Sequence, residues 1–587
     1  MAMLKEKILR AVLTCFTLVA VSGCASHSNK MEETKTLMRY GEYAAATDEI
    51  NLILEAERNQ LLKEVELGVV NQLKGNYQAS LKHLDAADKL ADELYTVSFG
   101  DLAVRASANA SLTIYRGNII ERVYINYFKM LNYFYLAEAA TSHQETQTLL
   151  DSARIEARRA MLLLDENVFK TGDYGVAEEE KKSLLYKFQQ IYAELNGEVI
   201  NPKELIFRDN AFSHYIIATL FEKMGEIDSA RVSYERAAKL YEQGYVKQYS
   251  LSADMVNQAW FDTTRMLKAK GDRRWLRMAA NKLSPAQRQE LSLSNKGKGL
   301  LVIVQEVDMI APRGELNLWA TIKNNKLVIR PIPIGKPEEK AYQLAWFYYM
   351  YADKGLLNVV EKIRAKDYVG LLNSNHEKTT SIPEALNSTL ESLGLLQVMS
   401  SIGIRLSVPL LYYEDLSIGK SRLEIDGESK GDLILADSIS GLAMAQHLVS
   451  AGSELNNAMA VEALRLTLCI QAGAPAQICA LAAGASTSAD TRSWLSLPYE
   501  IRTLRTNLPA GDYQLKLISD ADGFQLEQME TIKIKAGEVR LVRMRTFAID
   551  PNQPIPEVVE RIRSKNKVEL VKNEQATDVT SKGESNE

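Results

Sequence analysis

The segment Tyr215–Ala237, YIIATLFEKMGEIDSARVSYERA, decides the fold of the N-terminal half of the chain. Its apolar residues recur at helical spacing on both sides of Gly225. Because glycine tolerates a positive φ angle, Gly225 can end one helix and turn the chain into the next. Ala230 and Ala237 leave room for two helices to approach closely. The segment therefore predicts an antiparallel pair of helices.

The same pattern recurs along the N-terminal half. Gly41 and Gly75 stand in similar contexts, RYGEY and LKGNY, and lie 34 positions apart (75 − 41 = 34), which is the period of the tetratricopeptide repeat (TPR). A second good copy covers 67–87, and a divergent one covers 121–160. We therefore predict a TPR-like α-solenoid over 24–290, with generic antiparallel helices as the alternative. The residues expected to pack its helices are Gly68, Gly75, Ala218, Phe221, Gly225, Ala230, Tyr234 and Ala237.

The concave face of such a solenoid usually binds a peptide or another protein. An aromatic run is a candidate for that role, although aromatic residues at helical spacing are more typical of a core. The run consists of Tyr124, Tyr127, Phe128, Tyr133, Phe134 and Tyr135. We expect the groove of the TPR-like domain to hold a protein of the cell envelope.

From about Gly299 the hydrophobic period changes. Turn signals such as Asn324-Asn325 separate short apolar or alternating runs, and Pro331 and Pro333 make the run that contains them an edge strand or extended segment. Strands are predicted over 300–307, 315–322, 326–334, 513–517, 532–534 and 539–544, and helices over 339–366 and 432–469. The chain is thus predicted to be an α+β multidomain protein. Its TPR-like part precedes an α+β region, 299–548, with antiparallel β-sheets that resemble a sandwich, and 549–587 form a disordered tail.

The N-terminus has the features of an export signal. Lys5, Lys7 and Arg10 precede the apolar run 11–21, which is too short to span a membrane comfortably. The sequence at 21–24, VSGC, resembles a bacterial lipobox, although valine stands where leucine is more usual. A plain signal peptide or an uncleaved anchor is the alternative.

The lipobox resemblance implies removal of residues 1–23 and lipidation of Cys24. Acyl chains such as palmitate would hold the protein firmly, because each buried CH₂ contributes about 0.8 kcal/mol. Ala25 replaces the aspartate that favours retention in the inner membrane. The resemblance therefore implies a lipid anchor in the outer membrane, with the protein on the periplasmic face.

Two cysteines, Cys469 and Cys479, remain after processing, since Cys15 leaves with the signal peptide. Gly473 and Pro475 between them permit a turn, and an oxidising periplasm favours a disulfide. Two buried free thiols are the alternative. A metal site is not expected, because two thiols without a nearby histidine are too few ligands.

The whole chain also resembles a family of largely uncharacterised Gram-negative lipoproteins, which join TPR-like repeats to a C-terminal β-containing domain. The resemblance covers about 30–548 and brings no established catalytic residue. It rests on ERV at 121–123, LNY at 131–133, ARIEARR at 153–159, DTRSWLSLP at 490–498 and LPAGDY at 508–513.

No pattern for catalysis stands out in the sequence. There is no His-x-x-x-His or Gly-x-Ser-x-Gly, and NKGKGL at 295–300 lacks P-loop spacing. The net charge of −5 gives no basic field for nucleic acid. Asp490 and Arg492 beside Trp494 are read as a buried ion pair that positions the indole, with a ligand site as the alternative. We expect no enzyme, cofactor or metal.

Two functions fit these observations. The first is a scaffold for protein–protein interaction in assembly of the cell envelope, anchored by its N-terminal lipid. The alternative is a module in which the C-terminal β-domain binds glycan or peptidoglycan. Co-purification from envelopes would separate them, since protein partners favour the scaffold.

Overall fold

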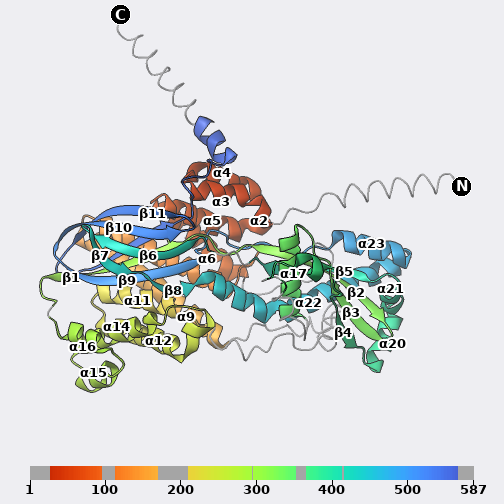
Figure 1. The fold of residues 1–587 in the computed structure, drawn as a ribbon, viewed down its shortest axis with the longest axis horizontal. Helices are drawn as coiled ribbons and strands as arrows, with labels where there is room; N and C mark the ends of the chain where they lie inside the picture. Colours follow the sequence, from red (N-terminus) through yellow and green to blue (C-terminus); the bar gives the residue numbers. More distant parts are fainter. Residues whose placement is uncertain are drawn as a thin grey trace, which may run out of the picture.

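The computed structural model describes residues 27–94, 113–169, 209–293, 295–351, 362, 365–412 and 416–565. The predicted signal peptide at 1–23 and the predicted lipidation site Cys24 lie outside this range. The fold is mixed α+β, as the sequence predicts. Figure 1 shows two lobes, one with a helical layer and two sheets and the other with a third sheet, and α22 runs between them.

Helices form the N-terminal half of the chain. They are α2 (His27–Lys30), α3 (Glu32–Arg39), α4 (Tyr43–Ile53), α5 (Gln60–Leu73), α6 (Tyr77–Leu94), α8 (Ile119–Ala139), α9 (His143–Phe169), α11 (Ala211–Lys223), α12 (Ile227–Leu240), α13 (Val246–Gln248), α14 (Asp254–Lys270), α15 (Arg273–Ala280) and α16 (Pro285–Ser292). Short turns of other helix types cover Glu57–Asn59 and Tyr241–Tyr245. Consecutive helices pack as pairs: α5 with α6, α8 with α9, and α11 with α12, which also packs against α14.

Local sequence explains where these helices begin and end. The amide of Asn210 caps α11 by accepting a hydrogen bond from the backbone of Ser213, and Asn118 caps α8 in a capping box with Glu121. Gly75 and Gly225 follow α5 and α11 with a φ of 75° each, a conformation that favours glycine.

The residues expected to pack the helix pairs lie at helix contacts. A Cβ added at Gly68 in α5 would lie 2.6 Å from Cδ2 of Leu84 in α6, so the two helices approach at a glycine. In the pair α11–α12, the hydroxyl groups of Thr219 and Tyr234 lie 3.0 Å apart. The other members are fully buried: Ala218, Phe221, Ala230 and Ala237.

The C-terminal half contains three four-stranded sheets. The strands are β1 (Lys298–Val307), β2 (Arg313–Lys323), β3 (Lys326–Pro331), β4 (Lys378–Ser381), β5 (Ile404–Leu411), β6 (Ile418–Ile425), β7 (Glu428–Asp432), β8 (Ile434–Ser438), β9 (Glu500–Pro509), β10 (Gly511–Ala521), β11 (Phe524–Ile534) and β12 (Val539–Thr546). The strand orders are β12-β1-β9-β8 in the central sheet, β11-β10-β6-β7 in the outer sheet and β4-β3-β2-β5 in the distal sheet. All pairs are antiparallel except β1 with β12.

Strand β1 shows how the first lobe is layered. Leu300, Val302 and Val304 belong to the hydrophobic core shared with the helices, whereas Leu301 and Ile303 belong to the core shared with the outer sheet. The strand is therefore apolar on both faces, which is the pattern of a strand with both sides covered. The lobe has three layers: helices, central sheet and outer sheet. The last two form the expected sandwich.

The distal sheet has its own core. It packs against the remaining helices, among them α21 to α23. Trp346 and Phe347 lie in this core, as do Leu455 and Ala463 of the long helix α22. The helices of this region are α17 (Pro337–Met350), α19 (Tyr368–Leu372), α20 (Glu384–Ser392), α21 (Leu395–Ser401), α22 (Ile439–Gln471) and α23 (Ala476–Ser486). No helix in the described part of the chain is long and apolar enough to cross a membrane.

Three local predictions were wrong. Strand β3 is internal, between β4 and β2, because it ends at Pro331 before the second proline can interrupt a ladder. The helix expected from 432 starts at Ile439, because the preceding residues pair as the short strand β8 and Ser438 caps the helix. The helix expected over 339–366 does not continue past Met350, where α17 ends with Tyr351 as its C-cap, and 352–361 and 363–364 lie outside the described residues.

The first part of the predicted tail is ordered. A helix covers 557–565, and Val559 is fully buried in the core of the first lobe. Arg563 forms an ion pair with Glu42 of the loop before α4, at 2.7 Å. This apolar contact was missed because a single valine in a charged segment gives no periodic signal. Residues 566–587 lie outside the described range.

Candidate functional site

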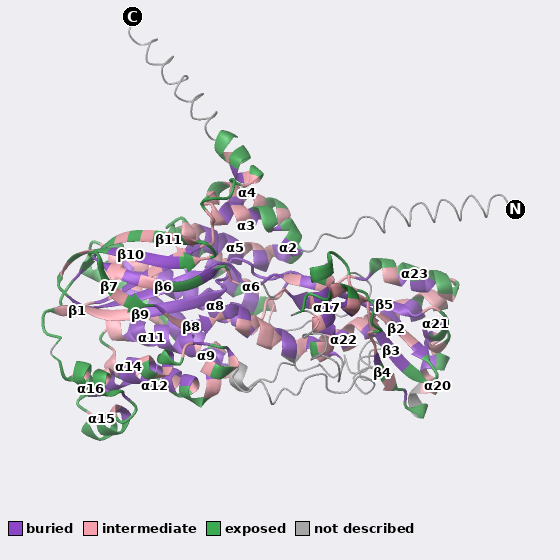
Figure 2. Ribbon diagram, viewed as in Figure 1, coloured by how far each residue is buried: buried purple, intermediate pink, exposed green. Residues whose placement is uncertain are grey.

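The inner face of the helix pairs is covered by the chain's own central sheet. The first helix of a pair faces the sheet: α8 contacts β1 and β8 through Tyr127 and Tyr124, and α11 packs on β12. The aromatic run of α8 is therefore mostly core, as its helical spacing indicates. Figure 2 shows that burial is concentrated where these helices meet the sheet. The boundary expected near 290–299 consequently does not separate two cores.

A buried carboxylate fixes α8 to the central sheet. Glu306 of β1 is fully buried, opposite Arg545 of β12, and its Oε2 lies 3.1 Å from Nη1 of that arginine. Nη1 of Arg543 lies 3.4 Å from the same oxygen. The hydroxyl of Tyr127 donates to Oε1 at 3.3 Å, and burial raises the pKa of Tyr127 so that it stays a donor.

A second buried network joins α11 and α14 to β9. Asp262 of α14 is fully buried and forms ion pairs with Arg505 of β9 and with Arg265, whose Nε lies 3.0 Å from Oδ1. The hydroxyl of Tyr215 donates to Oδ2 of this aspartate at 2.8 Å. Arg265 also reaches Glu222 at 2.7 Å. The charges are therefore paired, as buried charges must be.

Asp437 of β8 forms the third network. Its carboxylate accepts hydrogen bonds from the hydroxyls of Tyr124 at 3.0 Å and Tyr245 at 3.1 Å, and from the amide of Asn210 at 2.8 Å. Burial raises the pKa of Asp437, and these hydrogen bonds oppose that shift. The network ties α8, α11 and the turn after α12 to one strand.

The cluster of Asp490, Arg492 and Trp494 is structural. The guanidinium of Arg492 donates to both carboxylate oxygens of Asp490, at 2.8 and 2.7 Å. Trp494 is fully buried, and its ring lies 5.6 Å from that of Phe128 in an edge-to-face arrangement. The predicted ion pair is present, but Asp490 is 34% exposed, so the pair is only half-buried, and the contacts described for the indole are with Phe128 and Ser496.

Two carboxylates of the helical layer hold the backbone around this tryptophan. Oε1 of Glu121 accepts from the amide of Trp494 at 3.3 Å, and Oε1 of Glu66 accepts from the amide of Leu495 at 2.7 Å. Burial raises the pKa of Glu66 to about 7. Glu66 lies between α5 and the segment before β9, so the raised pKa reflects its burial in that contact.

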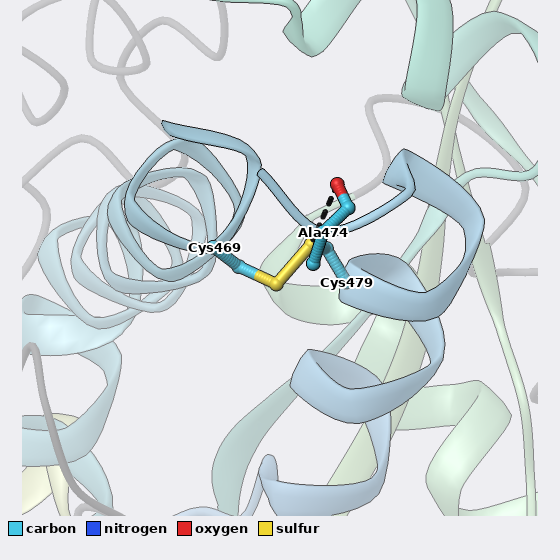
Figure 3. The surroundings of a disulfide bond; sticks show 3 residues. All are labelled: Cys469, Ala474 and Cys479. Atoms are coloured by element: carbon cyan, nitrogen blue, oxygen red, sulfur yellow. Dashed lines mark hydrogen bonds between the residues drawn. A yellow bond between two sulfur atoms is a disulfide. The ribbon is translucent and has the colours of Figure 1, made fainter. Parts of the chain in front are cut away.

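Cys469 and Cys479, the pair predicted from the sequence, are joined by a disulfide with a Cα–Cα distance of 5.7 Å. Figure 3 shows that it links the last turn of α22 to the start of α23, next to the carbonyl oxygen of Ala474. In the chain-entropy model, closure of so short a loop stabilises the fold by roughly 2–3 kcal/mol. No group of three metal-binding side chains occurs among the described residues.

An open basic concavity lies at the end of the first lobe, on α15 and α16. Its volume is about 570 Å³, and its lining consists of Arg274, Arg277, Met278, Ala280, Asn281 and Arg288. We call it the arginine pocket. Within the described ranges, none of these three arginines has a carboxylate partner. The segment 272–293 has five basic and two acidic residues, a net charge of +3 (5 − 2), whereas the whole chain carries −5.

Helical spacing explains the pocket. Asp272 caps α15 by accepting from the backbone of Trp275, and Leu276 and Ala279 face the core. Arg274, Arg277, Met278 and Asn281 recur at i, i+3, i+4 and i+7 and thus share the outer side. Guanidinium groups bind carboxylates and phosphates in a bidentate manner, so this surface can hold an anion.

The sequence interpretation passed over the arginine pocket, although RRWLR at 273–277 is a visible signal. It joins a cluster of arginines to an exposed tryptophan, a combination typical of binding surfaces. In comparisons with known proteins, no family model and no curated protein matches this chain. The resemblance to a lipoprotein family therefore stays a prediction.

Proposed function

We propose that this protein is an outer-membrane lipoprotein, anchored through Cys24, whose TPR-like helix pairs and sheets form a rigid scaffold for an envelope partner. The observation that carries the proposal is the arginine pocket: three guanidinium groups, without a carboxylate partner in the described part of the chain, on the outside of a body held together by buried ion pairs. A basic surface of this kind suits the binding of an anionic partner.

The partner-binding surface in this proposal differs from the groove expected from the sequence. The central sheet already occupies the inner face of the helix pairs, through contacts such as Arg505 with Asp262 and Tyr127 with Glu306. A partner peptide would have to displace that sheet and its buried charges. We therefore assign the partner to the arginine pocket, and we expect its contact surface to be acidic.

The alternative is recognition of peptidoglycan, whose stem peptides carry carboxylates. The same arginines favour it, together with the amide of Asn281, which can donate to and accept from a sugar hydroxyl. This alternative now involves the helical layer, whereas the sequence interpretation assigned glycan to the β-domain.

The anchor has its own test. Cys24→Ala should abolish acylation and leave the precursor unprocessed or mislocalised, because the thiol is the atom that would be acylated. Membrane fractionation and the mass of the N-terminal peptide measure the result. An unmodified Cys24 in wild-type protein that stays with the outer membrane would contradict the proposal.

The arginine pocket is tested by charge reversal. Arg274→Glu/Arg277→Glu should reduce the yield of cross-linked envelope protein at least tenfold, because it replaces attraction for an anionic partner with repulsion. Lys533→Glu/Lys535→Glu is the matched control, since it makes the same change in charge on exposed positions near the outer sheet.

Sedimentation with purified peptidoglycan separates the two functions. Loss of cross-linked protein alone supports the scaffold, and loss of sedimentation alone supports the alternative. If the pocket variant and the control behave like wild type in both assays, the arginine pocket is not the binding surface.

A further inference from the structure

One stretch of the chain carries no charged side chain. Between Arg465 and Asp490 lie 24 residues (489 − 465 = 24), and none is Asp, Glu, Lys or Arg. At the 25% charged content of this chain, about six would be expected. The stretch forms the end of α22, a turn and α23, which we call the neutral hairpin.

The neutral hairpin exposes large apolar side chains. Helix α23 turns Cys479 and Ala483 toward the core of the second lobe. On its outer side, Ile478 and Leu481 are 58% and 54% exposed, and Leu468 at the end of α22 is 52% exposed. Exposed apolar side chains on a segment that carries no charge of its own mark an interaction surface, at whose inner side Arg405 of β5 donates to the carbonyl oxygen of Gly484 in α23 at 3.1 Å.

The disulfide keeps this surface on the outside. It fixes α23 against the end of α22 (Figure 3), with Leu468 directly before Cys469 and Ile478 directly before Cys479. The helix therefore presents its apolar side without having to fold first. A preformed surface loses less conformational entropy when it binds.

The position of the hairpin identifies what it contacts. Five residues after α23 ends at Ser486, the hydroxyl of Thr491 accepts a hydrogen bond from the backbone amide of His27, at 2.9 Å. His27 is the third residue after Cys24, so an acylated Cys24 would lie within about 11 Å of it. In Figure 1, α2 and α23 lie in the upper half of the molecule, with α3, α4 and the C-terminal helix above α2, whereas α15 and α16 lie at the lower left.

We infer that the neutral hairpin is a membrane-contact surface, which inserts Leu468, Ile478 and Leu481 into the interfacial region of a lipid bilayer. An apolar helix side of this kind lies in the interface plane, with its side chains among the acyl chains. Because the inserted segment carries no charge of its own, its binding should depend little on anionic lipid or on salt. That the surface contacts a bilayer rests on the lipid anchor proposed above. The apolar surface itself is observed independently of that anchor.

Vesicle flotation tests this inference without the lipid anchor. The chain from Ala25 onward keeps every described residue and lacks the acylation site. It should float with vesicles of phosphatidylethanolamine and phosphatidylglycerol, equally at low and high salt. Ile478→Asp/Leu481→Asp should reduce the bound fraction at least tenfold, because two carboxylates would enter the apolar region. The matched control, Val369→Asp/Met529→Asp, also changes two exposed apolar side chains and should bind like wild type.

A second variant covers the case in which the aspartates unfold the hairpin. Ile478→Trp keeps the surface apolar, and its fluorescence should shift to shorter wavelength when vesicles are added. Absence of flotation by wild type, flotation of the aspartate variant at the wild-type level, or an unshifted tryptophan spectrum would each overturn the inference. The anchor is judged separately by the mass of the N-terminal peptide, so the two proposals can fail independently.

Discussion

Glu306→Gln should lower the free energy of unfolding by about 3–5 kcal/mol, because it leaves Arg543 and Arg545 buried without a counter-charge. The two guanidinium groups are 7% and 5% exposed, and the carboxylate between them is fully buried. Glutamine keeps the size of the side chain and one hydrogen bond with Tyr127, so the change isolates the charge. Chemical denaturation followed by circular dichroism measures the effect.

The matched control for this substitution is Glu290→Gln, on the exposed side of α16. It makes the same chemical change without a buried partner, and its unfolding midpoint should stay within the error of wild type. If Glu306→Gln and Glu290→Gln have equal free energies of unfolding, water must reach the helix–sheet contact and solvate the two arginines, so that they require no buried carboxylate.

Trp494→Ala should be destabilising by about 3–5 kcal/mol, the range for loss of a buried aromatic side chain. The indole packs on Phe128 of α8 and donates to the hydroxyl of Ser496 at 2.9 Å. Its removal leaves a cavity where the helical layer meets the segment before β9. We also expect faster proteolysis between the helical layer and the sheet, which limited trypsin digestion would detect.

Trp275→Ala supplies the comparison, because that tryptophan is 52% exposed on α15. Its loss should leave the unfolding midpoint unchanged while altering the surface beside the arginine pocket. A thermal midpoint for Trp494→Ala equal to that of Trp275→Ala would rule out a central packing role for the buried indole.

The sequence predicts those elements of the fold that depend on residues close together in the chain. Gly225 between two amphipathic stretches predicts the helix pair α11–α12. The spacing of the two cysteines around Gly473 and Pro475 predicts a short turn closed by a disulfide. The strong apolar run of β1 is visible for the same reason, since both of its faces are buried. Whether the helix pairs form a TPR solenoid stays a prediction.

The rest depends on contacts between distant residues. Strand β12 follows β11 in sequence but pairs with β1 in the central sheet, and no local pattern indicates that choice. The two arginines that pair with Glu306 lie 237 and 239 positions away, so its role is invisible in the sequence. Strand β8 is only five residues long and directly precedes a long helix, so the helical pattern of the sequence masks it.

The candidate site was missed for a different reason. The arginines of α15 give a clear charge signal in the sequence. The repeat pattern, however, points to the inner side of the helix pairs, which the central sheet of the same chain covers. Repeat spacing predicts which helix sides face inward, but it does not show what covers them. In this protein the covering layer comes from the other half of the same chain.

The parallel pairing of β1 with β12 has a consequence for biogenesis. Leu300 lies beside Val539, and the helical layer packs on the sheet that this pair completes. During synthesis, the N-terminal helices emerge first and keep an apolar side uncovered until the last strand follows. A chain that is cut short before residue 539 would expose that side permanently. Chaperones should therefore hold the emerging chain, and proteases should clear truncated copies.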